Sequence, residues 1–203
     1  MVSFPNRVGS RTFVWMILGV STFMTTNAAE KADLHPALAA TGRSPEIPES
    51  GDVYGWLIGS WELDVRDTLA DGSIRRTSGE AHFGWVLEGR AIQDVWIMPR
   101  RSERNAIAEK ARNTYGTTLR VWDPSIQAWR IKWVNPVTGG RDELIGRWSG
   151  KDIVQVGTSA DGTLIRWSFT EITEDSFNWL GESLNPDGKT WELKAEFRAK
   201  RLR

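Results

Sequence analysis

The sequence predicts an all-β fold: a closed antiparallel up-and-down β-barrel of about ten strands with a short N-terminal helical plug. Two features of the chain indicate this fold. Short segments in which apolar and polar residues alternate are separated by turn residues through most of the sequence. Ten of the twelve tryptophans are spread through these segments, from Trp61 to Trp191. Side chains of this size, placed on strand after strand, fill or line a small barrel.

Residues 1–28 have the features of a secretory signal peptide. Arg7 and Arg11 precede an apolar run over residues 13–24, and small or polar residues follow it as far as Ala29. We expect cleavage after Ala28. The apolar run is shorter than the roughly 20 residues that a spanning helix needs, so we expect no stable membrane span after cleavage. The protein is therefore predicted to be periplasmic or secreted from a bacterium, with an uncleaved N-terminal anchor as the alternative.

The composition of the remaining chain excludes several classes of function. Residues 1–28 contain two of the 26 Lys and Arg residues and none of the 26 Asp and Glu residues, which leaves 24 against 26, a net charge of −2. This balance argues against a nucleic-acid partner, which requires a basic surface. The absence of cysteine excludes disulfides, thiolate nucleophiles and cysteine metal sites. The sequence leaves the oligomeric state open.

Two segments follow the expected cleavage site. Residues 29–51 are rich in Ala, Pro, Ser and Glu and show no lasting period, which predicts a flexible leader. Residues 52–203 are expected to form one barrel domain, because the roughly 175 residues that remain after cleavage suit a single core. Residues 52–58 open this domain with a short apolar stretch that we expect to form a helical turn plugging one end of the barrel.

Each predicted strand is bounded by turn residues. The first ends at Asp71-Gly72, a strong hairpin signal. The second carries Gly79 and Gly84, where a strand can bend or bulge. A charged segment, 99–113, follows the third. The predicted strands are 61–66, 74–87, 91–98, 114–122, 128–134, 142–148, 152–158, 163–172, 176–184 and 190–199.

Period-two alternation assigns inner faces to some of these strands. The clearest alternations place Trp61, Leu63 and Val65 on one inner face and Trp191, Leu193, Ala195 and Phe197 on another, so that Trp191 belongs to the core. In strands 91–98 and 142–148 each face includes a polar residue. Some polar groups are therefore expected to point inward, and an inward charge requires a partner, water or a ligand.

Gly59-Ser60-Trp61, at the start of the first strand, resembles the motif of the calycin superfamily of lipocalins, fatty-acid-binding proteins and nitrobindins. The resemblance implies that Trp61 packs at the closed end of the barrel against an arginine of the last strands. Arg198 is the best match, with Arg201 behind it.

The segment 85–97, with Tyr115-Gly116-Thr117 and Trp122-Asp123-Pro124, is similar to an uncharacterised bacterial lipocalin-like branch. The later lipocalin signatures and the nitrobindin haem-ligand context are missing. The resemblance implies a fold and a habit of binding small molecules, but it transfers no catalytic residue.

We predict that the barrel binds a small apolar or aromatic ligand, with or without an anionic group, in an aromatic-lined cavity. Binding cavities combine apolar walls with a few placed polar groups, and an inward arginine would bind a carboxylate or phosphate through its two-pronged guanidinium. The alternative is that the tryptophans fill the barrel and the arginines face solvent. The candidate residues are Trp85, Trp96, Trp129, Trp133, Arg147, Arg166, Trp167 and Trp179.

Two other functions stay open. His82 and Asp94 fall on neighbouring strands and would form an acid–base pair if both faced one cavity. A solid-packed barrel would instead serve as an envelope interaction module, with segment 99–113 as its contact surface. We expect no cofactor and no metal site, since the sequence has no nucleotide-binding glycine loop and only one histidine within the barrel segment.

Overall fold

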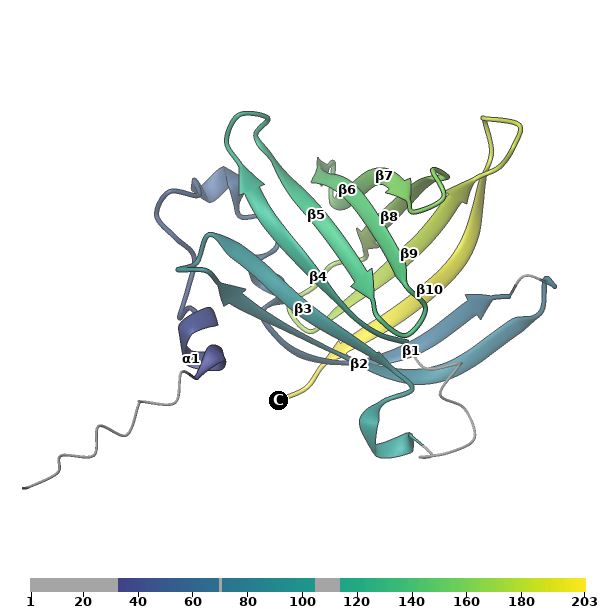
Figure 1. Ribbon diagram of the computed structural model, residues 1–203, viewed down its shortest axis with the longest axis horizontal. Coiled ribbons are helices and arrows are strands. Elements are labelled where there is room, and N and C mark those ends of the chain that lie inside the picture. The colour runs from purple at the N-terminus through teal and green to yellow at the C-terminus, as the bar shows by residue number, and fades with distance from the viewer. Residues whose placement is uncertain (1–32, 70, 105–113) are drawn as a thin grey trace, which may run out of the picture. The chain divides into compact units, whose positions relative to one another are not determined.

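The computed structural model describes residues 33–69, 71–104 and 114–203, so the expected signal peptide lies outside the described residues. The described part forms a closed barrel of ten antiparallel strands, and each strand pairs with the next along the chain while β10 pairs with β1 (Figure 1). This confirms the predicted up-and-down barrel. The strands are β1 Gly59–Thr68, β2 Ile74–Val86, β3 Ala91–Met98, β4 Thr114–Asp123, β5 Ala128–Asn135, β6 Gly140–Ser149, β7 Asp152–Ser159, β8 Leu164–Thr170, β9 Ser176–Leu184 and β10 Trp191–Arg201.

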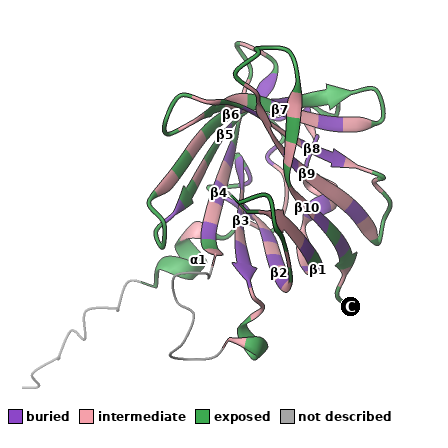
Figure 2. Cartoon of the chain, turned by 90° about the vertical axis from the view of Figure 1, so that its right-hand side faces the viewer, coloured by how far each residue is buried: buried purple, intermediate pink, exposed green. Residues whose placement is uncertain are grey.

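Buried and more exposed residues alternate along the strands (Figure 2). In β1 the side chains of Trp61, Leu63 and Val65 are buried in the core, as their spacing predicts. The alternation follows from the pleat, which points successive side chains to opposite faces of the sheet. The register between neighbouring strands therefore decides which residues meet inside the barrel. No helix in the described ranges is long and apolar enough to span a membrane.

The helical turn expected near the start of the domain is a short 3-10 helix, Gly55–Leu57. Tyr54 and Leu57 are fully buried, and the Tyr54 ring packs edge-on against Trp129, with the ring centroids 5.4 Å apart. The same ring lies 6.2 Å from Phe169. Aromatic pairs at such distances add to the free energy gained from burial. This turn is the predicted plug, and it fills one half of the barrel.

Residues 33–51 are not the flexible leader that their composition predicts. A short helix, α1 (Leu34–Leu38), precedes a stretch in which the Ala40 amide donates to the Trp85 carbonyl at 2.9 Å. The Ser44 amide donates to the Gly89 carbonyl at 2.9 Å, and Ile47 is 1% exposed. Backbone hydrogen bonds and the buried side chains of Ser44 and Ile47 hold the segment against the end of β2, which composition alone does not reveal.

The last strand contains a β-bulge that the alternation does not predict. The β9–β10 register shifts between Leu193 and Ala195, and Leu193 pairs with Glu182. Gly181 pairs with Trp167, which lines the interior, so its neighbour Glu182 points outward. Leu193 therefore lies on the outer face, and so does Trp191, two residues away. The predicted core position of Trp191 is wrong because one extra residue reverses the inward and outward sides of a strand.

Candidate functional site

The barrel holds a pocket of about 350 Å³ in the half away from the plug. Its lining includes Thr68 at the end of β1, Met98 at the end of β3 and Thr114 at the start of β4, which all lie at the same end of the barrel. The volume is at the lower end of the range of about 300–1,000 Å³ typical of small-molecule sites. The interaction-module alternative requires a barrel that is packed solid. The pocket shows that this barrel is not.

Five aromatic side chains line the pocket, and each of their rings contacts at least one other. The ring centroids of Trp133 and Trp167 are 6.4 Å apart, and those of Trp167 and Trp179 are 5.5 Å apart. Trp179 also lies 6.0 Å from Trp96 and stacks on Phe197 at 4.6 Å. These mutual contacts limit the rotamers of the indoles, so the wall presents rigid apolar surface to a ligand.

The candidate tryptophans divide between the two halves of the barrel. Trp96, Trp133, Trp167 and Trp179 line the pocket. Trp85 and Trp129 pack against each other, with centroids 6.3 Å apart, in the half that the plug fills. The indole nitrogen of Trp129 donates to the Gly51 carbonyl at 2.8 Å. These two tryptophans belong to the packed core, because the 3-10 helix and Tyr54 occupy the space that they face.

A buried ion pair lies at the inner end of the pocket. Arg120 of β4 lines the pocket, and its Nη1 donates to Oδ2 of Asp94 on β3. Both side chains are at most 1% exposed. The second Asp94 oxygen accepts the Thr118 amide at 2.8 Å. The register places Asp94 opposite Thr118, two residues from Arg120, so that the pair is a diagonal contact on the inner face.

Aromatic rings surround the Arg120 guanidinium. Its central carbon lies 5.2 Å from the ring centroid of Tyr54, 5.7 Å from that of Phe83 and 5.9 Å from that of Phe169. A cation near such ring faces is favoured, and more so where water is excluded. Within the described part of the chain, the buried Arg120 Nε has no hydrogen-bond partner. Arg120, which lines the floor of the pocket, therefore carries a buried N–H donor without a partner among the described residues.

Tyr54 adds a neutral polar group beneath this floor. Burial raises the pKa of the Tyr54 phenol above its usual value, and the nearby Arg120 charge only partly opposes that shift. The hydroxyl therefore stays protonated and donates to Gln155 Oε1 at 3.2 Å. Gly146 makes room for this group, because a Cβ at that position would lie 2.1 Å from the Tyr54 oxygen.

Charged residues at the pocket mouth are also paired. Arg75 Nε donates to Asp67 Oδ2 at 3.1 Å, and both residues line the pocket. Lys194, the extra residue at the bulge of β10, lines the pocket and lies 2.7 Å from Glu192 Oε1. Sequence reasoning missed Asp67, Arg75 and Lys194 as pocket residues. For Lys194 no local signal exists, because only the bulge turns it toward the interior.

The two candidate arginines lie outside the pocket. Arg147 is exposed and donates to the Ile126 carbonyl at 3.0 Å. Arg166 forms a two-pronged ion pair with Glu182, at 2.7 and 2.8 Å, and its guanidinium carbon lies 4.5 Å from the Trp191 ring centroid. Arg147 follows the inward Gly146, and Arg166 precedes the inward Trp167. The pleat therefore turns both arginines outward. The inward arginine is Arg120 of β4, which the predicted site did not include.

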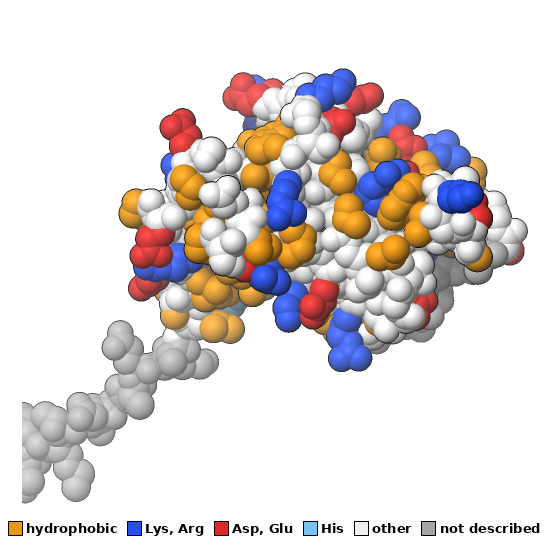
Figure 3. Space-filling view, turned by 90° about the horizontal axis from the view of Figure 1, so that it is seen from above, with side chains coloured by type: hydrophobic (Ala, Val, Ile, Leu, Met, Phe, Trp, Pro, Cys, Tyr) orange, Lys and Arg blue, Asp and Glu red, His pale blue; other side chains and the backbone are white. Residues whose placement is uncertain are grey.

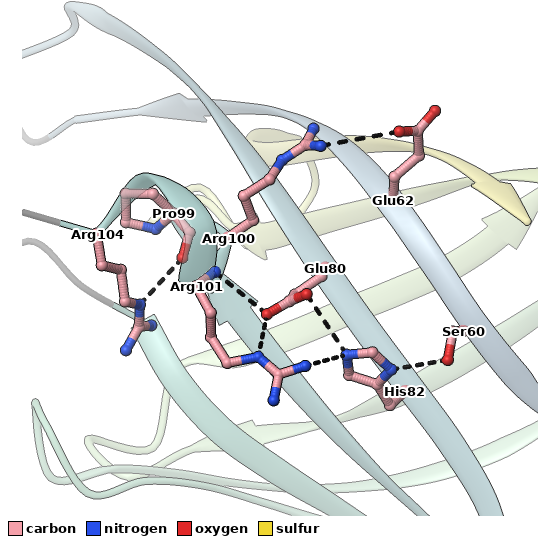
Figure 4. Close-up of polar contacts among 8 residues, drawn as sticks. All are labelled: Ser60, Glu62, Glu80, His82, Pro99, Arg100, Arg101 and Arg104. Atoms are coloured by element: carbon pink, nitrogen blue, oxygen red, sulfur yellow. Dashed lines mark hydrogen bonds and ion pairs between the residues drawn. The ribbon is translucent and has the colours of Figure 1, made fainter. Parts of the chain in front are cut away.

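His82 lies on the outer wall, in the group of polar contacts drawn in Figure 4. Its Nδ1 is 2.8 Å from Ser60 Oγ, and its Nε2 is 3.2 Å from Arg101 Nη2 and 3.6 Å from Glu80 Oε2. Asp94 pairs in register with Phe83, one residue away, and points inward. The predicted acid–base pair of His82 and Asp94 does not form, because adjacent residues of a strand face opposite sides.

Segment 99–113, proposed above as a contact surface, is described only as far as Arg104. Arg100 lies 3.9 Å from Glu62 Oε2, and Arg101 binds Glu80, so this part rests on the outer faces of β1 and β2 (Figure 4). On the face seen from above, hydrophobic side chains lie in several small groups between charged ones (Figure 3). Scattered apolar groups of this kind are ordinary on a protein surface.

Comparison with known proteins bears on the fold. No protein-family model matches the chain, and no curated protein matches it in sequence. The structure is similar to that of the S-type phycobiliprotein lyase CPES from Guillardia theta, with a TM-score of 0.50 and 12% sequence identity. The match covers 76% of this chain and 96% of that chain. The fold is calycin-like. At this identity the likeness extends to the arrangement of strands and not to particular residues.

Proposed function

We propose that this protein is an exported binding protein that holds a small aromatic ligand in its tryptophan-walled pocket. The observation that carries the proposal is the open half of the barrel: about 350 Å³ bounded by Trp96, Trp133, Trp167, Trp179 and Phe197. Export rests on the signal-peptide features of residues 1–28. The fold shared with a phycobiliprotein lyase supports ligand binding by the barrel.

The aromatic lining of the pocket favours a flat, rigid ligand. The wall offers ring edges and faces in several orientations, and each aromatic contact is worth about 0.5–1.5 kcal/mol beyond the burial of area. The polar groups gather at the two ends, around Arg120 inside and around Asp67 and Arg75 at the mouth. A ligand with an apolar ring system and polar substituents at its ends matches this distribution.

Blocking the pocket tests the proposal. The probe is 2-acetylnaphthalene, a neutral aromatic ketone, titrated into the mature protein while tryptophan fluorescence is recorded. Thr114 lines the pocket mouth, whereas its neighbour Tyr115 is exposed on the other face of β4. We expect Thr114→Trp to weaken binding by about tenfold or more, since a tenfold change requires only about 1.4 kcal/mol.

The matched control is Tyr115→Trp, which adds the same side chain on the outer wall and is expected to leave the affinity unchanged. Absence of saturable quenching in the unmodified protein, or equal affinities of the two variants, would contradict the proposal. Native mass spectra recorded before and after extraction with organic solvent provide a second readout, because a copurified ligand is lost on extraction.

A further inference from the structure

The cation at the floor of the pocket is already neutralised by the protein. Arg120 binds one oxygen of Asp94, and the Thr118 amide binds the other oxygen at 2.8 Å. The two charged side chains are at most 1% exposed, so solvent does not screen them. The pair therefore presents little net charge to the pocket, and the carboxylate of Asp94 has no oxygen left without a protein donor.

The Arg120 guanidinium at the floor nevertheless still has an N–H group that can donate a hydrogen bond. A guanidinium has five N–H groups and no acceptor. The Arg120 Nε is buried and has no partner in the part of the chain that the structure describes. A buried donor without a partner costs free energy that an acceptor on a ligand would recover. The chemistry offered at the inner end is thus that of a donor to a ligand oxygen or nitrogen, without an uncompensated positive charge.

The cations at the pocket mouth are also paired with carboxylates. Arg75 is held by Asp67, with Nε and Oδ2 3.1 Å apart, and Lys194 lies 2.7 Å from Glu192. Among the described residues, each cation that lines the pocket thus has its own carboxylate. An anionic ligand would lose its hydration on entering and would find no unpaired positive charge to offset that loss. Next to Arg120 it would also lie close to the Asp94 carboxylate, and two carboxylates that share one site repel each other.

We infer that the pocket selects neutral aromatic ligands that carry a carbonyl-type acceptor at the inner end, and that it discriminates against the corresponding carboxylates. This inference rests on the proposed function, since it specifies the chemistry of the ligand in the same pocket. It makes Arg120 and Asp94 a specificity-determining pair: Arg120 supplies the donor, and Asp94 prevents the donor from attracting an anion.

Three probes that share one ring system test the inference: naphthalene, 2-acetylnaphthalene and 2-naphthoate, each titrated at pH 7.5 with tryptophan fluorescence as readout. We expect 2-acetylnaphthalene to bind most tightly, several-fold better than naphthalene, and 2-naphthoate to bind at least about tenfold more weakly than the ketone. Binding of 2-naphthoate as tight as that of the ketone, or tighter, would overturn the inference.

Asp94→Asn separates charge from shape, because the amide keeps the volume and one acceptor of the side chain but removes the negative charge. We expect 2-naphthoate to bind this variant about tenfold more tightly than the unmodified protein, with little change for the ketone. Glu182→Gln is the matched control, because it removes a carboxylate from Arg166 on the outer face and should change neither affinity. An unchanged preference in Asp94→Asn would count against the role of Asp94.

The outcomes distinguish this inference from the proposed function. If all three probes bind the unmodified protein and Thr114→Trp weakens them, the pocket is a ligand site, and the ranking of ketone and carboxylate alone decides the inference. If no probe binds, the proposed function fails and the inference fails with it. Should Asp94→Asn not fold, the ranking of the three probes on the unmodified protein still gives the decision.

Discussion

The guanidinium carbon of Arg201 lies 4.1 Å from the ring centroid of Trp61 and joins the last strand of the barrel to the first. The same guanidinium donates to the carbonyl oxygens of Trp56 at 2.6 Å and Ile58 at 2.8 Å. Its Nε donates to the Glu174 carbonyl at 2.8 Å. Trp61 and Arg201 are direct partners in the β1–β10 register. The resemblance to calycins implies such a contact, with Arg198 as the best match and Arg201 behind it, and the structure gives the contact to Arg201.

Replacing Arg201 should destabilise the barrel far more than replacing Arg198. Arg201→Ala removes a cation–π contact and three hydrogen bonds, and we expect it to lower the free energy of unfolding by about 2–4 kcal/mol. Arg198 pairs with Asp64 in register on the outer face, so Arg198→Ala should change stability by less than about 0.5 kcal/mol. Urea denaturation of both variants gives the comparison. Equal losses would show that Arg201 does not close this end.

The buried Asp94–Arg120 pair should be sensitive to the loss of one partner. Asp94→Ala leaves the Arg120 charge buried without its carboxylate, and we expect a loss of about 3–5 kcal/mol in the free energy of unfolding. The double variant Asp94→Leu with Arg120→Met removes both charges and should be more stable than Asp94→Ala. Chemical denaturation measures both. A double variant as unstable as the single one would mean that the loss of packing, rather than an unpaired buried charge, causes the loss of stability.

Tryptophans in the two halves of the barrel should respond differently to truncation. Trp129 is fully buried, and Trp129→Ala is expected to cost about 3–5 kcal/mol of stability. Trp167 is half-buried in the pocket wall, so Trp167→Ala should cost less stability but weaken 2-acetylnaphthalene binding. Thermal denaturation and fluorescence titration separate the two effects. Similar changes in both measurements for both variants would contradict the division of the barrel into a filled and an open half.

Asp142 should reduce stability at neutral pH. It pairs in register with Trp133 on the inner face, and partial burial raises the pKa of its carboxyl, with repulsion from Asp161 as a second cause. The folded state therefore binds the proton more tightly than the unfolded chain. The penalty is present above the folded-state pKa and disappears as the pH falls below the ordinary value of 3.8. Asp142→Asn should thus stabilise the protein at pH 7 and make no difference at pH 3.

Urea denaturation of the unmodified protein and of Asp142→Asn at the two pH values tests this expectation. Asp187→Asn serves as a control at pH 7, because hydrogen bonds from Thr190 and Lys189 lower the pKa of that exposed carboxyl and its ionised form is favoured in the fold. Its replacement should destabilise the protein, the opposite sign. A gain in stability for both variants would indicate a general effect of negative charge rather than burial of Asp142.

Much of the candidate site could be read from strand periodicity, and some of it could not. The inward positions of Trp133 and Trp167 follow from alternation within their own strands. The charged residues were harder to place. Asp94 and His82 lie one pair apart on adjacent strands, as their spacing predicts, but the register pairs Asp94 with Phe83, so that Asp94 faces inward and His82 outward. A shift of one residue in pairing decides such cases, and the sequence of one strand does not specify its pairing with the next.

The sequence by itself determined the closed ten-stranded barrel, the helical plug and the presence of inward polar groups, because alternation and turn residues act within a few positions of each other. The tertiary structure decided that residues 33–51 pack on the barrel, that Arg201 rather than Arg198 meets Trp61, and that Trp191 faces outward. It also decided that the tryptophans leave a space. These outcomes depend on register, on one bulge and on how deeply Tyr54 enters the barrel, and each is a contact between segments far apart in the chain.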